Sequence, residues 1–279
     1  MLQKIEKIIK SPTGRELSLD YRLPELEKVK AVVVFAHGFK GFKDWGDFNQ
    51  VAGEIAKAGF LFVKFNFSHN GTDPDNPVDF VDLNAFSENT FQKELLDFEA
   101  VLAFVDELTM ELGLKDMPIH LMGHSRGGYT TILKAILDDR VHKAVAWAPV
   151  SNPKNRFESD PKFEEWKENG ISHIMNGRTN QNMPLLFDLA KEVLNDPTFY
   201  DLQTRLEHSE LKLCCIHGTD DESVPHADSE QLYDWSFNTE LVLLDNADHT
   251  FGMVHPGSGS LPDDAKIAVE CTILFLLEA

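Results

Sequence analysis

The chain has 279 residues, enough for one sizeable domain, and 42% of them are hydrophobic, including 20 Phe that can fill a real core. Its 46 acidic residues against 26 basic ones give a formal net charge of -20, which disfavours nucleic acid and anionic membrane surfaces as partners. The N-terminus lacks the apolar stretch of a signal peptide, and no segment approaches the roughly 20 apolar residues of a membrane helix, so we expect a cytoplasmic protein.

The predicted elements begin with a hairpin and continue as strands alternating with helices. KIEKIIK and ELSLDYRL flank the turn SPTG and show period-two alternation, which predicts an antiparallel pair. Six later runs are continuously apolar, as is typical of strands covered on both faces: AVVVFAHG, FLFVKFNF, PIHLMGH, KAVAWAP, LKLCCIHG and ELVLLDNA. Helical patterns lie between or after them, at 47–59, 91–108, 127–137, 226–237 and 263–279. This order predicts an α/β fold with a mostly parallel sheet, helices on both faces, and functional residues at the carboxyl ends of the strands.

One segment, 151–210, interrupts the alternation. It is polar, contains four prolines, and reads as short helical pieces between the strand KAVAWAP and the strand LKLCCI. We interpret it as an inserted lid over the active end of the sheet, so that 1–150 and 211–279 form the core domain. Its scattered apolar residues are candidates to line a substrate pocket: Phe157, Trp166, Met175 and Met183. Arg178 in the same segment either recognises a polar part of the substrate or serves a turn.

The three cysteines predict reduced, buried thiols. Cys214 and Cys215 are neighbours in one apolar strand and therefore point to opposite faces, and Cys271 lies in the apolar C-terminal segment. An odd number of cysteines cannot pair completely, which favours a reducing compartment.

The sharpest motif is PIHLMGHSRGGYTTI, in which Gly123, Ser125 and Gly127 form G-x-S-x-G. It directly follows a predicted strand and precedes a predicted helix, which is the context of a nucleophile elbow. Side chains at the two flanking glycine positions would collide with neighbouring backbone. Ser125 is therefore the candidate nucleophile, presented beside a helix N-terminus that favours developing negative charge.

With this motif the chain resembles the α/β-hydrolases, and within them the dienelactone hydrolase-like and cinnamoyl or feruloyl esterase-like serine hydrolases. The resemblance covers nearly all of the chain apart from the inserted segment. It implies a sheet of about eight mostly parallel strands and a triad of Ser, acid and His in that chain order.

The triad histidine must lie within hydrogen-bond reach of the serine, and eleven histidines compete for this role. His249, in NADHTF, follows the last predicted strand, where the family places its catalytic histidine. His255 is the nearest rival, and His69 lies on another loop at a strand end. His37, His124 and His217 are expected to shape loops and bond backbone.

Three adjacent carboxylates compete for the acid position in HGTDDESVP, residues 217–225. The family pattern H-G-x-x-D-x-x-V-P selects Asp221. If the stretch is extended, Asp221 points one way, whereas Asp220 and Glu222 point the other way as solvated bystanders.

The resemblance also implies an oxyanion hole made by the backbone N–H groups of Phe39, in VVVFAHGFKG, and Arg126. The Phe39 side chain is either part of the acyl pocket or a plain core aromatic. The acidic stretch 72–82 lacks the glycine and the distal glutamate of an EF-hand, and no zinc, nucleotide or other cofactor motif is present, so we expect no metal and no cofactor.

These features predict a serine hydrolase, first of all a carboxylesterase for small to medium neutral or aromatic esters. A prolyl oligopeptidase-like peptidase and a thioesterase share the acyl-transfer mechanism and stay open. A catalytically silent scaffold is the non-enzymatic alternative, although every triad position is filled. The expected partner is a small-molecule ester, and the sequence leaves open whether the protein is a monomer or a homodimer.

Overall fold

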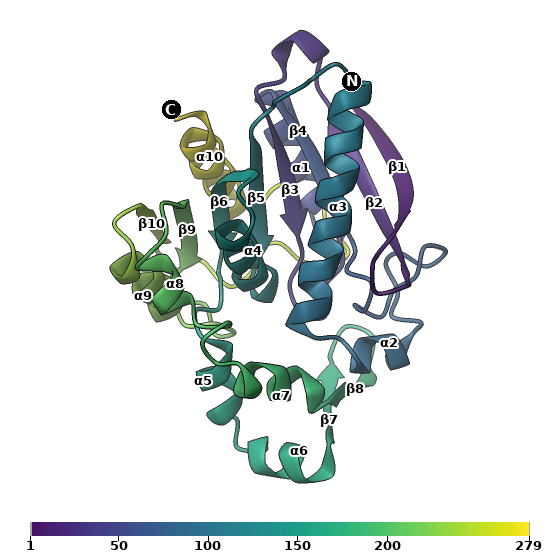
Figure 1. Ribbon diagram of the computed structural model, residues 1–279, viewed down its shortest axis with the longest axis vertical. Helices are drawn as coiled ribbons and strands as arrows, with labels where there is room; N and C mark the ends of the chain where they lie inside the picture. Colours follow the sequence, from purple (N-terminus) through teal and green to yellow (C-terminus); the bar gives the residue numbers. More distant parts are fainter. Residues whose placement is uncertain (1, 279) are drawn as a thin grey trace.

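The computed structural model describes residues 2–278 and is built around one eight-stranded sheet (Figure 1). In spatial order its strands are β1 (Gln3–Lys10), β2 (Glu16–Leu23), β4 (Phe60–Phe65), β3 (Ala31–Ala36), β5 (Ile119–His124), β6 (Val141–Trp147), β9 (Lys212–Gly218) and β10 (Thr239–Leu244). All neighbours from β4 to β10 pair in parallel, whereas β2 pairs antiparallel with both β1 and β4. The predicted hairpin, the six apolar strands and the mostly parallel sheet are confirmed.

Helices cover both faces of this sheet (Figure 1). On one face lie α1 (Phe48–Lys57) and α10 (Asp263–Leu277), which pack against each other. On the other lie α3 (Phe91–Glu111), α4 (Arg126–Leu137) and α9 (Ala227–Trp235). Buried side chains of each central strand alternate between two cores: Val32 and Val34 face α3 and α4, whereas Val33 and Phe35 face α1. Because helices cover both faces of the sheet, its strands need apolar residues at successive positions rather than at alternate ones.

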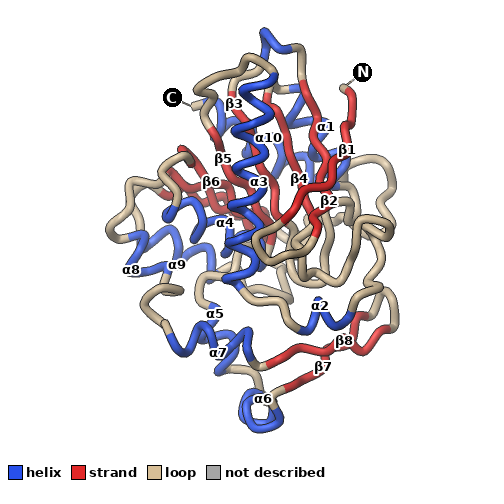
Figure 2. The backbone as a smooth tube through the Cα atoms, turned by 45° about the vertical axis from the view of Figure 1, so that its right-hand side comes forward, coloured by secondary structure: helices blue, strands red, loops and turns tan. Residues whose placement is uncertain are grey.

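Most of the chain from 151 to 210 lies beyond the carboxyl ends of the parallel strands, whereas residues 202–206 pack against α4 and α9 (Figures 1 and 2). It holds α5 (Pro153–Glu158), α6 (Phe163–Asn169), the two-stranded hairpin β7 (Ile171–Asn176) and β8 (Gln181–Leu186), α7 (Asp188–Asn195) and α8 (Leu202–Leu206). The expectation of helical pieces alone was wrong, because β7 and β8 pair with each other. The strand β8 packs against α2 (Leu83–Ser87), a helix that precedes this segment in the chain. A short 3₁₀ helix, η1 (Leu26–Lys28), precedes β3.

Specific contacts attach this segment to the core. The Glu192 carboxylate on α7 accepts a 2.5 Å hydrogen bond from the Phe91 N–H at the start of α3. The Tyr129 hydroxyl on α4 donates to the Tyr200 carbonyl at 2.6 Å, and Arg156 Nη2 donates to the Ser223 carbonyl at 2.7 Å. The last bond joins the inserted segment to the loop that follows β9.

All three cysteines are free thiols. Cys214 and Cys215 are buried in the two different cores, as their alternation in the strand predicts. Cys271 is only half-buried, so its expected full burial was wrong: it lies on a flank of α10 that solvent reaches.

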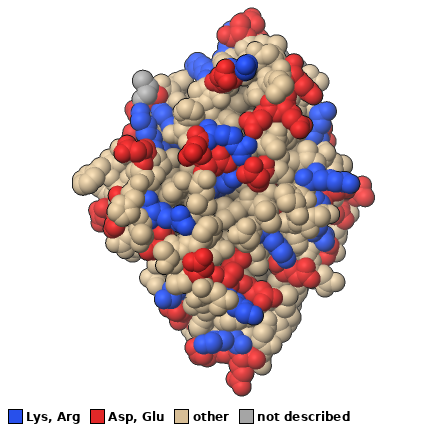
Figure 3. Space-filling model, viewed as in Figure 1, with Lys and Arg blue, Asp and Glu red and all other residues tan. Residues whose placement is uncertain are grey.

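On the face drawn in Figure 3, acidic and basic side chains are interspersed rather than gathered into one large patch of a single sign. Within residues 2–278, no helix combines the length and the apolar character needed to cross a membrane.

Candidate active site

Ser125 occupies the turn between β5 and α4. Its backbone has φ 57° and ψ −124°, a conformation that non-glycine residues rarely adopt. The Ser125 N–H donates to the Trp147 carbonyl of β6 at 2.8 Å, and its carbonyl accepts from the Gly128 N–H at 2.9 Å. The surrounding hydrogen bonds hold this strained serine at the carboxyl end of the central strand.

The two motif glycines are required by close backbone contacts. A Cβ atom at Gly123 would lie 2.3 Å from the Gly127 carbonyl oxygen and equally close to Thr131 Oγ1. A Cβ atom at Gly127 would lie 2.3 Å from the His37 carbonyl oxygen. No side chain fits at such distances, so these glycines let α4 start directly against β5 and β3.

His249 and Asp221 form a direct pair. His249 Nδ1 donates to Asp221 Oδ2 at 2.6 Å, although the two residues come from loops after different strands, β10 and β9. The Asp221 side chain is fully buried, whereas that of His249 is 19% exposed. An acceptor at Nδ1 fixes the proton there and leaves Nε2 free to accept one.

Asp221 is held as a carboxylate by several donors. Its Oδ1 accepts from the N–H groups of Ser223 at 2.7 Å and Val224 at 2.8 Å. Burial alone would raise the pKa of Asp221, but the hydrogen bonds from His217, His249 and the Val224 backbone outweigh it, so the pKa lies well below its usual value. Asp220 and Glu222 are exposed, as expected for bystanders, although the stretch forms a turn and a bend rather than the extended backbone on which that expectation was based.

His217 is a member of this group that the sequence analysis did not assign. Its Nε2–H is shared between the Val224 carbonyl at 3.0 Å and Asp221 Oδ2 at 3.1 Å, while Nδ1 accepts from Ser229 Oγ at 2.7 Å. The expected backbone bond is present, and the additional bond ends on Asp221 Oδ2, the same oxygen that His249 contacts. In the sequence, only the position of His217 four residues before Asp221 indicates this role.

The other histidines are engaged elsewhere. His124 Nε2–H donates to the His249 carbonyl at 2.9 Å, and His37 Nδ1–H donates to the Gly38 carbonyl at the same distance. Burial lowers the pKa of His124 to about 3, so this ring stays neutral beside the His249 ring at 4.8 Å. His255 Nδ1 accepts from the Gly46 N–H at 3.0 Å, and His69 Nδ1 is bonded to Ser68 Oγ at 2.8 Å.

Two backbone N–H groups beside Ser125 match the expected oxyanion hole. Arg126 is the first residue of α4, where N–H groups have no partner within the helix. Phe39 follows β3, and Gly38 lies so close that a Cβ atom there would be 3.0 Å from Ser125 Cβ. Within residues 2–278, neither N–H group donates to a backbone acceptor in a loop or turn.

A cavity of about 820 Å³ opens over Ser125 and His249, both of which line it. Its walls come from the core and from the inserted segment, and they are largely apolar and aromatic. Three of the residues expected to contact substrate lie in these walls: Phe39, Phe157 and Trp166.

Met175, Arg178 and Met183 are not among the described residues that line this cavity, so their expected contact with substrate is corrected. Met183 is fully buried in a small cluster with Phe42 and two other phenylalanines. The Arg178 guanidinium lies 5.2 Å from the centre of the Phe42 ring, and Met175 is 54% exposed. Met183 is paired with Ile174, whereas Met175 lies on the other, exposed face of the hairpin and Arg178 lies in the turn between β7 and β8. The sequence analysis missed this pairing.

Comparison with protein families decides the classification. Residues 84–254, more than half of the chain, match the model of the prolyl oligopeptidase family. The chain belongs to the prolyl oligopeptidase family. The matched region contains Ser125, Asp221 and His249, and membership makes the protein a hydrolase. No match was found among the curated proteins.

Solved structures similar to this family member have the α/β-hydrolase fold. Est1E from Butyrivibrio proteoclasticus is 16% identical, with 98% of this chain and 97% of that chain covered and a TM-score of 0.72. The esterase domain of a Rhodothermus marinus protein is 18% identical over 98% of each chain, with a TM-score of 0.68. Dienelactone hydrolase from Anabaena variabilis is 15% identical, with 99% of this chain and 97% of that chain covered and a TM-score of 0.64.

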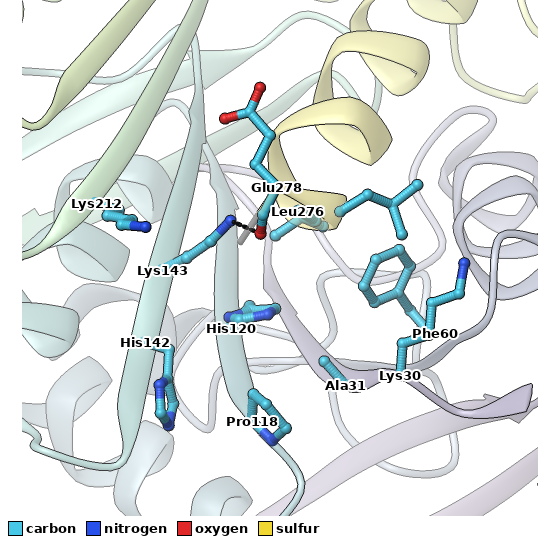
Figure 4. Close-up of a pocket in the computed structure, with 11 residues that line it drawn as sticks. Lys30, Ala31, Phe60, Pro118, His120, His142, Lys143, Lys212, Leu276 and Glu278 are labelled. Carbon is cyan, nitrogen blue, oxygen red and sulfur yellow. Dashed lines mark hydrogen bonds between the residues drawn. The ribbon is translucent and has the colours of Figure 1, made fainter.

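This prolyl oligopeptidase family member has a second pocket, of about 410 Å³, at the other end of the parallel strands (Figure 4). Ala31 and Phe60, the first residues of β3 and β4, line it together with the end of α10. Lys143 Nζ donates there to the carbonyls of Phe275 at 2.8 Å and Glu278 at 2.7 Å, which fastens the C-terminal helix to the sheet. Because this pocket is at the amino ends of the strands, it is remote from Ser125.

Proposed function

We propose that this protein is a serine hydrolase that cleaves small to medium carboxylic esters through Ser125, His249 and Asp221. The observation that carries the proposal is the 2.6 Å bond from His249 Nδ1 to the buried Asp221, beside a cavity lined by both His249 and the strained Ser125.

The proton moves between Ser125 and His249. His249 Nε2 accepts the Ser125 hydroxyl proton as Oγ attacks the ester carbonyl, and the resulting imidazolium returns that proton to the departing alcohol. Asp221 stabilises the imidazolium and stays ionised because its other oxygen holds two backbone N–H donors. A water molecule then attacks the acyl-enzyme through the same proton transfers, and the acid is released as Ser125 regains its proton.

The negative charge of the tetrahedral intermediate falls on the former carbonyl oxygen. The N–H groups of Phe39 and Arg126 donate to this oxygen, and each such donor is typically worth about 10² to 10³ in kcat. His124 assists by remaining neutral, because a second cation beside His249 would oppose formation of the imidazolium.

The apolar and aromatic walls favour an ester with an aliphatic or aromatic acyl group. A structure of Est1E, which shares the fold, was solved with ferulic acid bound, and this supports an aromatic acid as one candidate.

Family membership favours a peptidase as the second candidate. A peptidase that holds the amino terminus of its substrate needs carboxylates in the pocket, and the described lining contains one, the exposed Asp160. The ester is therefore the better match to the cavity.

The test is a matched panel: 4-nitrophenyl hexanoate, the hexanoyl 4-nitroanilide and a hexanoyl thioester, each with wild type, Ser125→Ala and the control Ser223→Ala. We expect kcat/KM to be largest for the oxygen ester and to vanish in Ser125→Ala while Ser223→Ala retains it. Equal turnover by wild type and Ser125→Ala would refute the proposal, and faster cleavage of the anilide would select the peptidase.

A further inference from the structure

The candidate cavity reverses the charge balance of the chain. The whole sequence has 46 acidic and 26 basic residues. Among the described residues that line the cavity, Lys40, Arg126, Arg156 and Lys162 are basic and Asp160 is acidic. Basic residues therefore outnumber acidic ones in the lining near Ser125, although acidic residues predominate in the whole chain.

Lys40 is a cation of the cavity wall that has no counter-ion among the described residues. It directly follows Phe39, is half-buried, and within residues 2–278 its ammonium group has neither an ion pair nor a hydrogen bond. Burial lowers the pKa of Lys40, as expected for an ammonium group with no carboxylate beside it.

The backbone conformation of Lys40 is unusual for a residue with a long side chain. Its φ is 55°, in the left-handed region where glycine or asparagine is favoured and a long side chain has no conformational advantage. The turn is closed by the Gly41 N–H, which donates to the Gly38 carbonyl at 3.0 Å. Strain of this kind is often found at functional sites, and this turn carries the Phe39 N–H that we assign to the oxyanion hole.

Arg126 is more deeply placed than Lys40, and its charge is paired with Glu94. The residue is only 8% exposed, and its guanidinium lies 4.6 Å from the centre of the Phe91 ring and 5.6 Å from that of Phe39. Its Nη2 lies 3.0 Å from Glu94 Oε1 and forms an ion pair with this buried carboxylate. Of these two residues, Lys40 is therefore the cation that an anionic group of the substrate would meet without a competing carboxylate.

From these contacts we propose that the substrate is an ester carrying a negatively charged group, which Lys40 binds beside the reacting carbonyl. The proposal rests on the proposed ester hydrolysis and names its substrate class. It replaces the neutral substrate expected from the sequence, because the local charge of the cavity differs in sign from the net charge.

The kinetic test compares esters that differ only in charge. For a charge on the acyl side, the pair is 4-nitrophenyl hydrogen adipate and 4-nitrophenyl methyl adipate. For a charge on the leaving group, it is 4-carboxyphenyl hexanoate and its methyl ester. We divide kcat/KM for the charged ester by kcat/KM for the neutral ester of the same pair. In one of the two pairs, Lys40→Met should lower this ratio about tenfold, which is the usual effect of losing one partly buried charge contact.

Two further variants separate charge from structure. Lys40→Arg keeps the positive charge and should preserve most of the ratio. Lys191→Met removes an exposed lysine of α7 that is outside the cavity lining and should leave the ratio at its wild-type value. The same fall in Lys40→Met and Lys191→Met, or no fall in either ester pair, would overturn the proposal.

Binding to Ser125→Ala gives a readout that needs no turnover. Calorimetry should show monomethyl adipate binding about tenfold more weakly when Lys40→Met is added, with little change for dimethyl adipate. If no ester is hydrolysed, the proposed function fails, and this binding difference still decides the charge proposal. If esters are hydrolysed but the charged ligand shows no dependence on Lys40, the charge proposal alone fails.

Discussion

Replacing Asp221 with Asn changes one carboxylate oxygen into an NH₂ group, and four hydrogen bonds end on this carboxylate. The oxygen of Asn remains with the N–H groups of Ser223 and Val224, because an NH₂ group there would face two donors. The new NH₂ group then faces His249 Nδ1, which must become an acceptor. The His249 proton moves to Nε2, and the ring can no longer take a proton from Ser125.

The loss follows from this change of tautomer. An Asp→Asn change in a Ser-His-Asp triad that leaves the geometry intact lowers kcat by about 10⁴. This factor corresponds to about 5 kcal/mol in the activation free energy. The assay is kcat for 4-nitrophenyl hexanoate, with urea unfolding of the same sample to establish that the variant is folded.

Asp220→Asn is the matched control, since it is the same change one residue earlier, at an exposed side chain. It should keep kcat within about twofold of wild type, as expected for a solvated surface position. An Asp221→Asn enzyme that retains a tenth of the wild-type kcat, or an Asp220→Asn enzyme that loses as much as Asp221→Asn, would refute the reasoning.

Three further predictions concern the elbow, a buried carboxylate of α3 and the support of the triad acid. Gly123→Ala should lower the free energy of unfolding in urea by about 3 kcal/mol or more, because its Cβ atom would lie 2.3 Å from the Gly127 carbonyl oxygen. Gly53→Ala, in open space on α1, should raise the free energy of unfolding by about 1 kcal/mol. Equal effects of the two substitutions would contradict this prediction. Burial raises the pKa of Asp97 to about 7, so its contribution to stability is present below pH about 4 and is lost as pH rises through 7. The unfolding free energy of wild type relative to Asp97→Asn should therefore fall across that window, and a constant difference would contradict the assignment. His217→Leu should lower kcat roughly tenfold, because Asp221 Oδ2 loses one of its two donors, and an unchanged kcat would show that His249 alone orients the acid.

The sheet was predictable because burial on both faces imposes a simple pattern. AVVVFA and the other apolar runs have no polar alternation, and each became a strand between helices. The β7–β8 hairpin was not predictable in this way. Its strands ISHIMN and QNMPLL mix polar and apolar residues, Pro184 interrupts the second, and they pair only with each other.

The candidate site shows a similar division. Ser125 could be placed because the elbow needs its own glycines within the same short stretch. The spatial partners could not be derived from local sequence alone: His217 contacts Asp221 through a turn, and Lys40 lines the cavity through the loop after β3. The sequence could not show that Met175, Arg178 and Met183 lie outside the cavity lining, because it did not reveal the pairing of β7 with β8.

The central claim is that Ser125 is an activated nucleophile, and covalent labelling tests it most directly. Wild type and Ser125→Ala are treated with a fluorophosphonate and digested, and the modified peptide is identified by mass spectrometry. We predict one label on wild type, on the peptide that contains Ser125, and none on Ser125→Ala. Equal labelling of the two proteins, or a label on another serine of wild type, would contradict the account.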